Sequence, residues 1–168
     1  KSGSSSITLK EWVILCQLQQ ELVAQGWKTP WNLSGGREGD TSFKGVTIDR
    51  SHIVGIDLSY QSLTGTIPAC VFTFPKLATL SFAHNELSGN IDKMFADMAS
   101  MIVVNPSFKS SLKILDLSHN NFTGDIGLIT NASSALEQLE TLDVSHNGLT
   151  NVSKALPLSI KSLNISCQ

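Results

Sequence analysis

The fold of this chain is decided by the stretch Leu112-Lys-Ile-Leu-Asp-Leu-Ser-His-Asn120, because its pattern returns along the sequence. Four other segments keep the same apolar spacing, LxxLxLS in shorthand, and they are residues 53–59, 77–83, 139–145 and 160–166. The second core position of the five copies is, in order, Ile56, Leu80, Leu115, Leu142 and Leu163. Successive copies are therefore 24, 35, 27 and 21 residues apart. Self-similarity at this period predicts a chain built of stacked repeats.

Each copy has the pattern of a short strand with one buried face. Leu115 and Leu117 alternate with polar Asp116 and Ser118, which is the period of two that a half-buried strand requires. One unit cannot bury its apolar face alone, so neighbouring units must stack. The pattern L-x-x-L-x-L followed by a side-chain amide is the signature of a leucine-rich repeat. We therefore expect the α/β class, as a curved leucine-rich-repeat solenoid with a parallel sheet on its concave face.

A column of side-chain amides follows the strands and can bond the exposed backbone of the neighbouring turn. The column consists of Gln61, Asn85, Asn120, Asn147 and Gln168.

The second half of three units, residues 63–67, 87–91 and 122–126, reads L-[ST]-G-x-I, with Phe122 replacing the leucine once. The glycine supplies a turn that a residue with a Cβ atom resists, and the isoleucine should point back to the core. This form resembles the plant-type leucine-rich repeat, known in plant receptor ectodomains and some bacterial surface proteins. The last full unit departs from it, because Asn151 stands in place of the glycine and residues 155–160 look like a shorter bacterial repeat.

Residues 8–52 are expected to form an N-terminal cap, because the first repeat would otherwise expose its apolar end. A capping-box pattern from Thr8 to Glu11 predicts the start of a helix, and Gly26 predicts its end. The expected buried stripe of this helix consists of Trp12, Leu15, Cys16, Leu22 and Val23. The helix, the tryptophan-rich loop after it and the strand-like segment 43–48 resemble the cap of plant-type repeat ectodomains. Residues 1–7 read as a linker or cloning scar, and residues 53–168 as about four and a half repeats.

The cysteines depart from this resemblance. The plant cap carries one cysteine two residues before its aromatic residue and another after G-V-x, and these places hold Thr41 and Ile48 here. No cap disulfide is expected, which favours a bacterial or other microbial relative. Of the three cysteines, Cys16 and Cys70 are expected to be buried free thiols, and Cys167 to lie in the last strand near the chain end.

The step of 35 residues leaves about ten extra residues between positions 92 and 111. Phe95, Met98, Met101 and Ile102 have helical spacing, which predicts a short helix on the convex side followed by a loop. Long insertions in solenoids usually map to one face and sometimes bind a ligand. A connector without a binding role is the alternative.

The composition argues against several classes of function. The net charge is −2 and only 15% of residues are charged, without a basic stripe, so nucleic-acid binding is not expected. No apolar run approaches the length of about 18 residues that would suggest a membrane span. The sequence contains no G-x-S-x-G elbow, phosphate loop or H-E-x-x-H motif. We therefore expect no enzymatic activity, no cofactor and no membrane insertion.

Two polar columns run across the repeats. The mid-strand column reads Asp57, Ser81, Asp116, Asp143 and Asn164, and the column before the amides reads Tyr60, His84, His119 and His146. Neighbouring strands lie about 4.8 Å apart, so Asp116 and Asp143 should be adjacent. Imidazoles beside carboxylates are the ligands of divalent-metal sites. Both residue types are also ordinary in the recurring form LDLSHN, so repetition alone accounts for them and no metal site is expected.

The concave face remains as the candidate site. Its candidate ligand-binding residues are Asp57, Tyr60, Ser81, His84, Ile114, Asp116, His119, Asp143 and His146. We expect a non-enzymatic module that binds a protein, peptide or glycan at the cell surface or as a secreted protein. The alternatives are a structural or adhesive protein of surface assemblies and a targeting domain of a larger protein.

The chain ends at Gln168 without a C-terminal cap. An open strand edge and an exposed apolar end favour association. Self-association through this end is therefore expected if the chain is whole.

Overall fold

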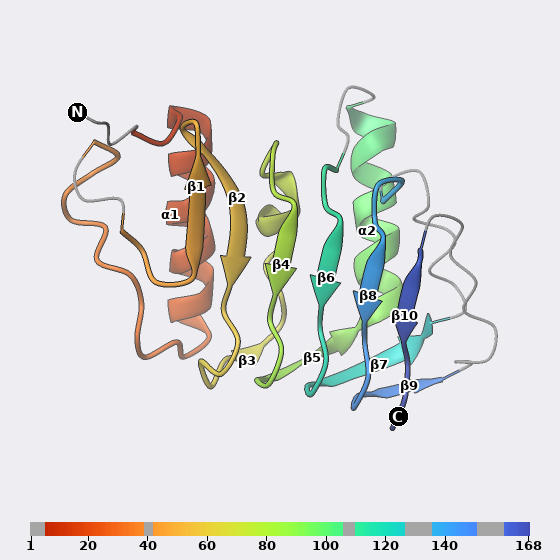
Figure 1. Ribbon diagram of the computed structural model, residues 1–168. Helices are drawn as coiled ribbons and strands as arrows, with labels where there is room; N and C mark the ends of the chain where they lie inside the picture. The colour runs from red at the N-terminus through yellow and green to blue at the C-terminus, as the bar shows by residue number, and fades with distance from the viewer. Residues whose placement is uncertain (1–5, 39–41, 106–109, 127–135, 151–159) are drawn as a thin grey trace.

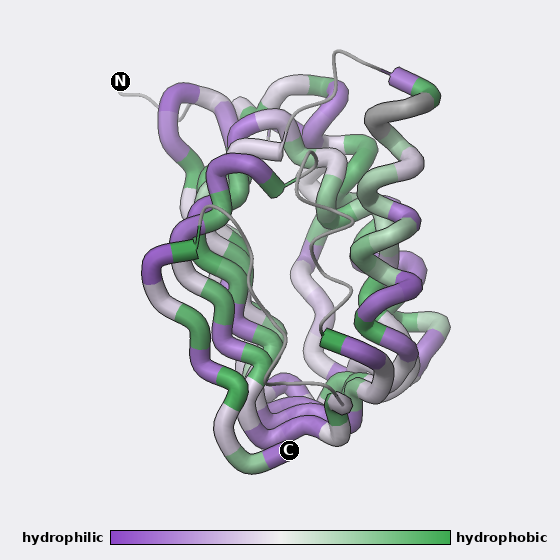
Figure 2. Tube along the Cα trace, turned by 90° about the vertical axis from the view of Figure 1, so that its right-hand side faces the viewer, coloured by the Kyte–Doolittle hydropathy of each residue, from purple (hydrophilic) through white to green (hydrophobic). Residues whose placement is uncertain are grey.

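The computed structural model describes residues 6–38, 42–105, 110–126, 136–150 and 160–168. Within these ranges the chain winds through two sheets, with its helices on the side opposite the larger sheet (Figure 1). The tube in Figure 2 shows the same layers edge-on, with the larger sheet facing the helices across the interior. Each LxxLxLS copy thus contributes one strand to the larger sheet.

The larger sheet contains one strand from every LxxLxLS copy. Its six strands are β1 (Val46–Asp49), β2 (His52–Asp57), β4 (Thr79–Ser81), β6 (Ile114–Asp116), β8 (Thr141–Asp143) and β10 (Ser162–Asn164), paired in that order. β1 runs antiparallel to β2, and all other neighbours are parallel. Ile56, Leu80, Leu115, Leu142 and Leu163 are register partners across it. The expected α/β solenoid with a parallel concave sheet is confirmed.

The sequence did not predict a second parallel sheet. Its four strands are β3 (Thr64–Gly65), β5 (Glu86–Asn90), β7 (Asn121–Asp125) and β9 (Gly148–Thr150). Three of them contain the L-[ST]-G-x-I turns, whose glycines Gly65, Gly89 and Gly124 have φ values of 84°, 117° and 111°. The isoleucines after these glycines are buried, as expected. Asn151 and residues 155–159, where the last unit departs from this form, lie outside the described residues.

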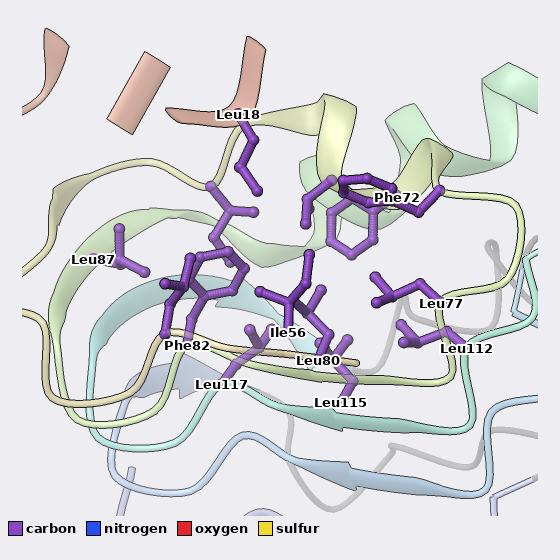
Figure 3. Packing of buried hydrophobic residues seen from close by; sticks show 14 of the residues in the cluster. Leu18, Ile56, Phe72, Leu77, Leu80, Phe82, Leu87, Leu112, Leu115 and Leu117 are labelled. Carbon is purple, nitrogen blue, oxygen red and sulfur yellow. The ribbon is translucent and has the colours of Figure 1, made fainter. Parts of the chain in front are cut away.

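One continuous apolar core fills the space between the sheets and the helices. Leu80 and Leu115 from the large sheet, and Leu117 directly after β6, belong to the same cluster as Phe72 and Leu18 from the helical side (Figure 3). Their side chains are at most 4% exposed. Burying apolar area in this way is the main driving force of folding, and here it ties each unit to the next.

The amide column closes the turns between strands, as the sequence predicts. Asn85 accepts hydrogen bonds from the backbone N–H groups of Gln61 and Leu63 at 2.9 and 3.0 Å, and its Nδ2 donates to Leu58 O and Phe82 O at 2.9 Å each. Asn120 and Asn147 repeat this arrangement.

The two glutamines of this column differ. Gln168 behaves like the asparagines, because its Nε2 donates to Val144 O at 2.9 Å and its Oε1 accepts from Leu149 N at 3.2 Å. Gln61 instead joins the cap, accepting from Trp27 Nε1 at 3.4 Å and Thr29 Oγ1 at 3.0 Å.

The cap helix α1 (Leu9–Ala24) begins after Thr8 and ends before Gly26, as expected. The face of this helix that is buried differs from the predicted face by a rotation about the helix axis. The buried residues are Glu11, Ile14, Leu15, Leu18 and Leu22. Val23 is 44% exposed, and Trp12 and Cys16 are only half-buried. Ile7, assigned to the linker 1–7, is fully buried and belongs to the core.

Glu11 makes only part of the predicted capping box. Its backbone N–H donates to Thr8 Oγ1 at 3.3 Å, but its carboxylate does not bond the Thr8 N–H, which donates to Ser51 O at 3.1 Å. The fully buried carboxylate accepts instead from Ile53 N at 2.8 Å and Thr8 Oγ1 at 2.6 Å, and lies 2.8 Å from His52 Nδ1. This carboxylate therefore ties α1 to β2.

The insertion contains the expected helix, α2 (Ile91–Val104), beside the short 3-10 helix η1 (Ala69–Thr73). Asn90 caps α2 by accepting from Lys93 N at 3.1 Å. Phe95 and Met98 are buried, whereas Met101 is half-buried. No helix among the described residues is long and apolar enough to cross a membrane.

The thiols are less buried than predicted. Cys16 and Cys70 are free but half-buried, and Cys167 is exposed and follows β10 instead of lying in it. Burial raises the pKa of Cys70 to about 12, with a further contribution from Glu21, whose carboxylate accepts from the thiol at 3.4 Å. Burial also raises the pKa of Cys16.

Candidate binding surface on the concave sheet

The concave face is the face of the six-stranded sheet that points away from the helices (Figure 1). Eight of the nine predicted residues form two rows on it, and the ninth, Ile114, lies in β6 as the register partner of Thr79. Asp57, Ser81, Asp116 and Asp143 are register partners in β2, β4, β6 and β8. Asp116 and Asp143 are therefore neighbours, as the strand spacing predicts.

The carboxylates of the mid-strand row have a structural role that the sequence did not reveal. Oδ1 of Asp57 accepts from both the backbone N–H and the hydroxyl of Ser59, at 3.0 and 2.6 Å. Asp116 and Asp143 do the same with the serines two residues later. Short acidic side chains commonly bond the backbone two residues on in this way. The recurrence of D-x-S in the repeat is thus explained by turn formation.

The second row is a column of stacked rings that lies in the turns after the strands. Tyr60 and His84 are 4.3 Å apart between ring centroids, and the steps from His84 to His119 and from His119 to His146 are 4.0 Å each. The interplanar angles are 8°, 13° and 13°. Parallel strand spacing places the rings one above the next, so we name this the ring column.

All four residues of the ring column have left-handed backbone, with φ of 56° or 57°. Histidine is among the residues enriched in this conformation outside glycine. Cys167, with φ of 57°, occupies the corresponding position of the fifth unit. The same left-handed turn therefore recurs in all five units, whether the residue is tyrosine, histidine or cysteine.

The rings do not form a metal site. Stacked imidazoles present their faces to one another, so their nitrogens do not converge on a common point. Among the described residues, no three histidine, cysteine, aspartate or glutamate side chains are grouped so that they could hold a metal ion.

A hollow of about 440 Å³ lies at the N-terminal end of the concave face. Six of the nine predicted residues line it: Asp57, Tyr60, Ser81, His84, Ile114 and Asp116. His119, Asp143 and His146 lie further along the same rows and are not in its lining. Tyr60 is 71% exposed and Ile114 44%, so two large apolar groups remain accessible at this surface.

Thr79 also lines the hollow but was not among the predicted site residues. Its register partner is Gly55, where an added Cβ atom would lie 2.8 Å from Thr79 Oγ1 and 3.3 Å from the Cβ of Thr47. A glycine at an outward strand position was the signal available in the sequence. Because Gly55 has no side chain, it leaves room for the side chain of Thr79 at this part of the surface.

Comparison with known proteins agrees with this architecture. The family model described as leucine-rich repeats (2 copies) matches residues 110–158 and indicates no catalytic family. The calmodulin-binding receptor kinase CaMRLK of Arabidopsis thaliana is 33% identical over 109 residues, which is 65% of this chain and 14% of that protein. The chain therefore spans only about a seventh of this relative.

Two solved structures share the fold. The ectodomain of the receptor kinase SOBIR1 from Arabidopsis thaliana has a TM-score of 0.56 at 19% identity, covering 97% of this chain and 95% of that one. The ectodomain of the Arabidopsis receptor kinase HAESA, solved with an extended IDA peptide hormone ligand, has a TM-score of 0.59 at 22% identity, covering 94% of this chain and 29% of that one.

These comparisons give no support to the microbial origin suggested by the missing cap cysteines. The relatives described are plant proteins. Residues 110–158 therefore match leucine-rich repeats, and the chain resembles plant receptor-like leucine-rich-repeat proteins in sequence and in fold.

Proposed function

We propose that this chain is a non-enzymatic recognition module that binds a peptide or protein ligand through its concave face. The observation that carries the proposal is the hollow of about 440 Å³, which brings six of the nine predicted residues together on one surface. Concave surfaces with a few convergent polar groups are the default sites of ligand binding.

The chemistry of the hollow suits a peptide that carries a basic group near an apolar one. Asp57 and Asp116 use Oδ1 for their serine partners, and within the described residues no protein group bonds their Oδ2 atoms. Tyr60, a residue type enriched at binding hot spots, is exposed at one end of the ring column. Ile114 supplies an exposed apolar contact on the neighbouring strands.

The extracellular position of the module is part of the proposal. The similar solved structures are described as ectodomains of receptor kinases, and HAESA is described in complex with a peptide hormone. A microbial source stays a prediction.

Three other outcomes stay open to test. A glycan could occupy the same polar hollow, and the repeats could instead serve self-association or surface assembly. The chain could also be the targeting part of a larger protein.

A random peptide library displayed on phage tests the proposal. Peptides selected on the chain are remeasured against Tyr60→Ala, His84→Ala and Ile114→Asp, with Glu86→Ala in the second sheet as the matched surface control. The proposal predicts weaker binding for the three concave variants and unchanged binding for the control. Peptides that bind all four variants equally well would overturn it, and a glycan array probed with the same variants separates the glycan outcome.

A further inference from the structure

A second hollow, which the proposed function does not use, lies on the helical side of the solenoid. It has a volume of about 350 Å³ and is bounded by α2, the turn of η1 and the ends of β5 and β7. Its apolar lining includes Ile67, Phe72, Met94, Met98, Met101 and Phe122. Figure 1 shows α2 beside η1 on the side away from the concave face, so the two surfaces are separate.

The insertion creates this hollow. Asn90, the last residue of β5, also caps α2, and the preceding Gly89 has a φ of 117°. Met94, Met98 and Met101, at the helical spacing of three and four residues, line the hollow together with Ala69 and Phe72 of η1.

The methionine distribution distinguishes this site from an ordinary packing defect. The chain contains three methionines, and all three line this hollow. Methionine side chains are flexible and polarisable, adapt to irregular partners and make favourable sulfur–aromatic contacts. Phe72 and Phe122, at most 4% exposed, add two aromatic rings to the same lining.

The charges beside the hollow largely cancel. Lys93 Nζ lies 2.9 Å from Asp97 Oδ2, and both residues are exposed members of the lining. A ligand that carries a net charge would gain little from this pair and would lose hydration in the apolar interior. The lining therefore favours an uncharged molecule.

We propose that this hollow is a binding site for a small, uncharged aromatic molecule of about two fused rings. A dry apolar cavity of about 150 Å³ accepts benzene, and this hollow has more than twice that volume. Its walls on the helix, the turn and the strands suit a compact molecule and not an extended chain. Met101 also lines a neighbouring apolar hollow of about 400 Å³ with Val104.

The three methionine methyl groups provide a direct test, because every methionine signal reports on the site. The full chain with isotope-labelled methionine methyl groups is titrated with 2-naphthol, which is uncharged near neutral pH. Nuclear magnetic resonance measures the affinity of the chain for this probe. We expect saturable shifts of all three methyl signals, caused by the ring current of the bound probe.

Two matched substitutions locate the binding. Ala69→Phe places a ring in the hollow from an exposed position on η1, and Ala96→Phe makes the same change at an exposed position of α2 outside the lining. Ala69→Phe should weaken 2-naphthol binding by about tenfold or more, and Ala96→Phe by less than about twofold. Thermal unfolding of both variants checks that each is folded.

Two further probes test the chemical class. The 2-naphthoate anion, with the same rings and one charge, should bind about fivefold more weakly than 2-naphthol, and aliphatic 1-octanol should also bind more weakly. Absence of saturable methyl shifts, equal binding by folded Ala69→Phe, or tighter binding of either comparison probe would overturn the proposal. None of these outcomes depends on ligand binding at the concave face.

Discussion

Removing the Glu11 carboxylate should lower the free energy of unfolding more than removing the carboxylate of an exposed acidic residue. Glu11 is 0% exposed and accepts from Ile53 N at 2.8 Å and from Thr8 Oγ1 at 2.6 Å. Its Oε2 also lies 2.8 Å from His52 Nδ1. These contacts join the start of α1 to the second strand of the sheet, so the substitution Glu11→Ala removes several links at once.

The size of the effect follows from what the substitution leaves behind. The Ile53 N–H, in a residue that is itself 0% exposed, would lose its acceptor, which costs about 1–3 kcal/mol. The lost charge-assisted bond from the Thr8 hydroxyl adds about 1.5–3 kcal/mol. We expect Glu11→Ala to lower the free energy of unfolding by about 4 kcal/mol, which is the sum of these two costs. Glu11→Gln keeps an acceptor for Ile53 and should cost about 1 kcal/mol.

Urea unfolding followed by circular dichroism measures both changes. Glu86→Ala is the matched control, because Glu86 is exposed in the second sheet and its loss should change stability by less than about 0.5 kcal/mol. A cost for Glu11→Ala below about 1 kcal/mol, or one equal to that of Glu86→Ala, would refute the buried-carboxylate reasoning.

The remaining predictions concern the amide column, a glycine turn and the thiols. Asn120→Ala should cost about 3 kcal/mol in urea unfolding, because a buried backbone N–H and three carbonyl groups lose their partner; a cost near zero would contradict the column's structural role. Gly124→Ala should lower the melting temperature, at a cost of about 2 kcal/mol, because φ is 111° and the added Cβ would clash with the side chains of Asp92 and Asn90; an unchanged melting temperature would count against that turn. At pH 8 a thiol reagent should modify Cys167 first, because it is exposed, whereas the raised pKa values of Cys70, at about 12, and Cys16 keep those thiols protonated. Rapid modification of all three thiols in the folded chain would contradict this order.

The repeat predicted the large sheet well because its information is periodic. The positions equivalent to Leu115 recur along the sequence, and stacking them fixes both the strands and their register. Adjacency of Asp116 and Asp143 followed from the same register. The second sheet was missed because its strands are short and their N-x-[ST]-G-like composition signals turns more strongly than strands.

Non-repeating contacts could not be predicted in the same way. The buried stripe of α1 was rotated in the prediction because Glu11, a charged residue, is in fact buried against His52 and Ile53, far away in the sequence. The sequence predicted which residues of the candidate site face outward, but it did not predict how far the hollow extends along them. The hollow ends after Asp116, so the later members of both rows lie outside it.

The most direct test of the central proposal is a nuclear magnetic resonance titration of the labelled chain with a peptide selected from the phage library. The account predicts that the largest shifts fall on Tyr60, His84 and Ile114 and on the neighbouring residues of β2, β4 and β6. Shifts confined to α2 and η1, with the concave face unchanged, would contradict recognition by the concave sheet.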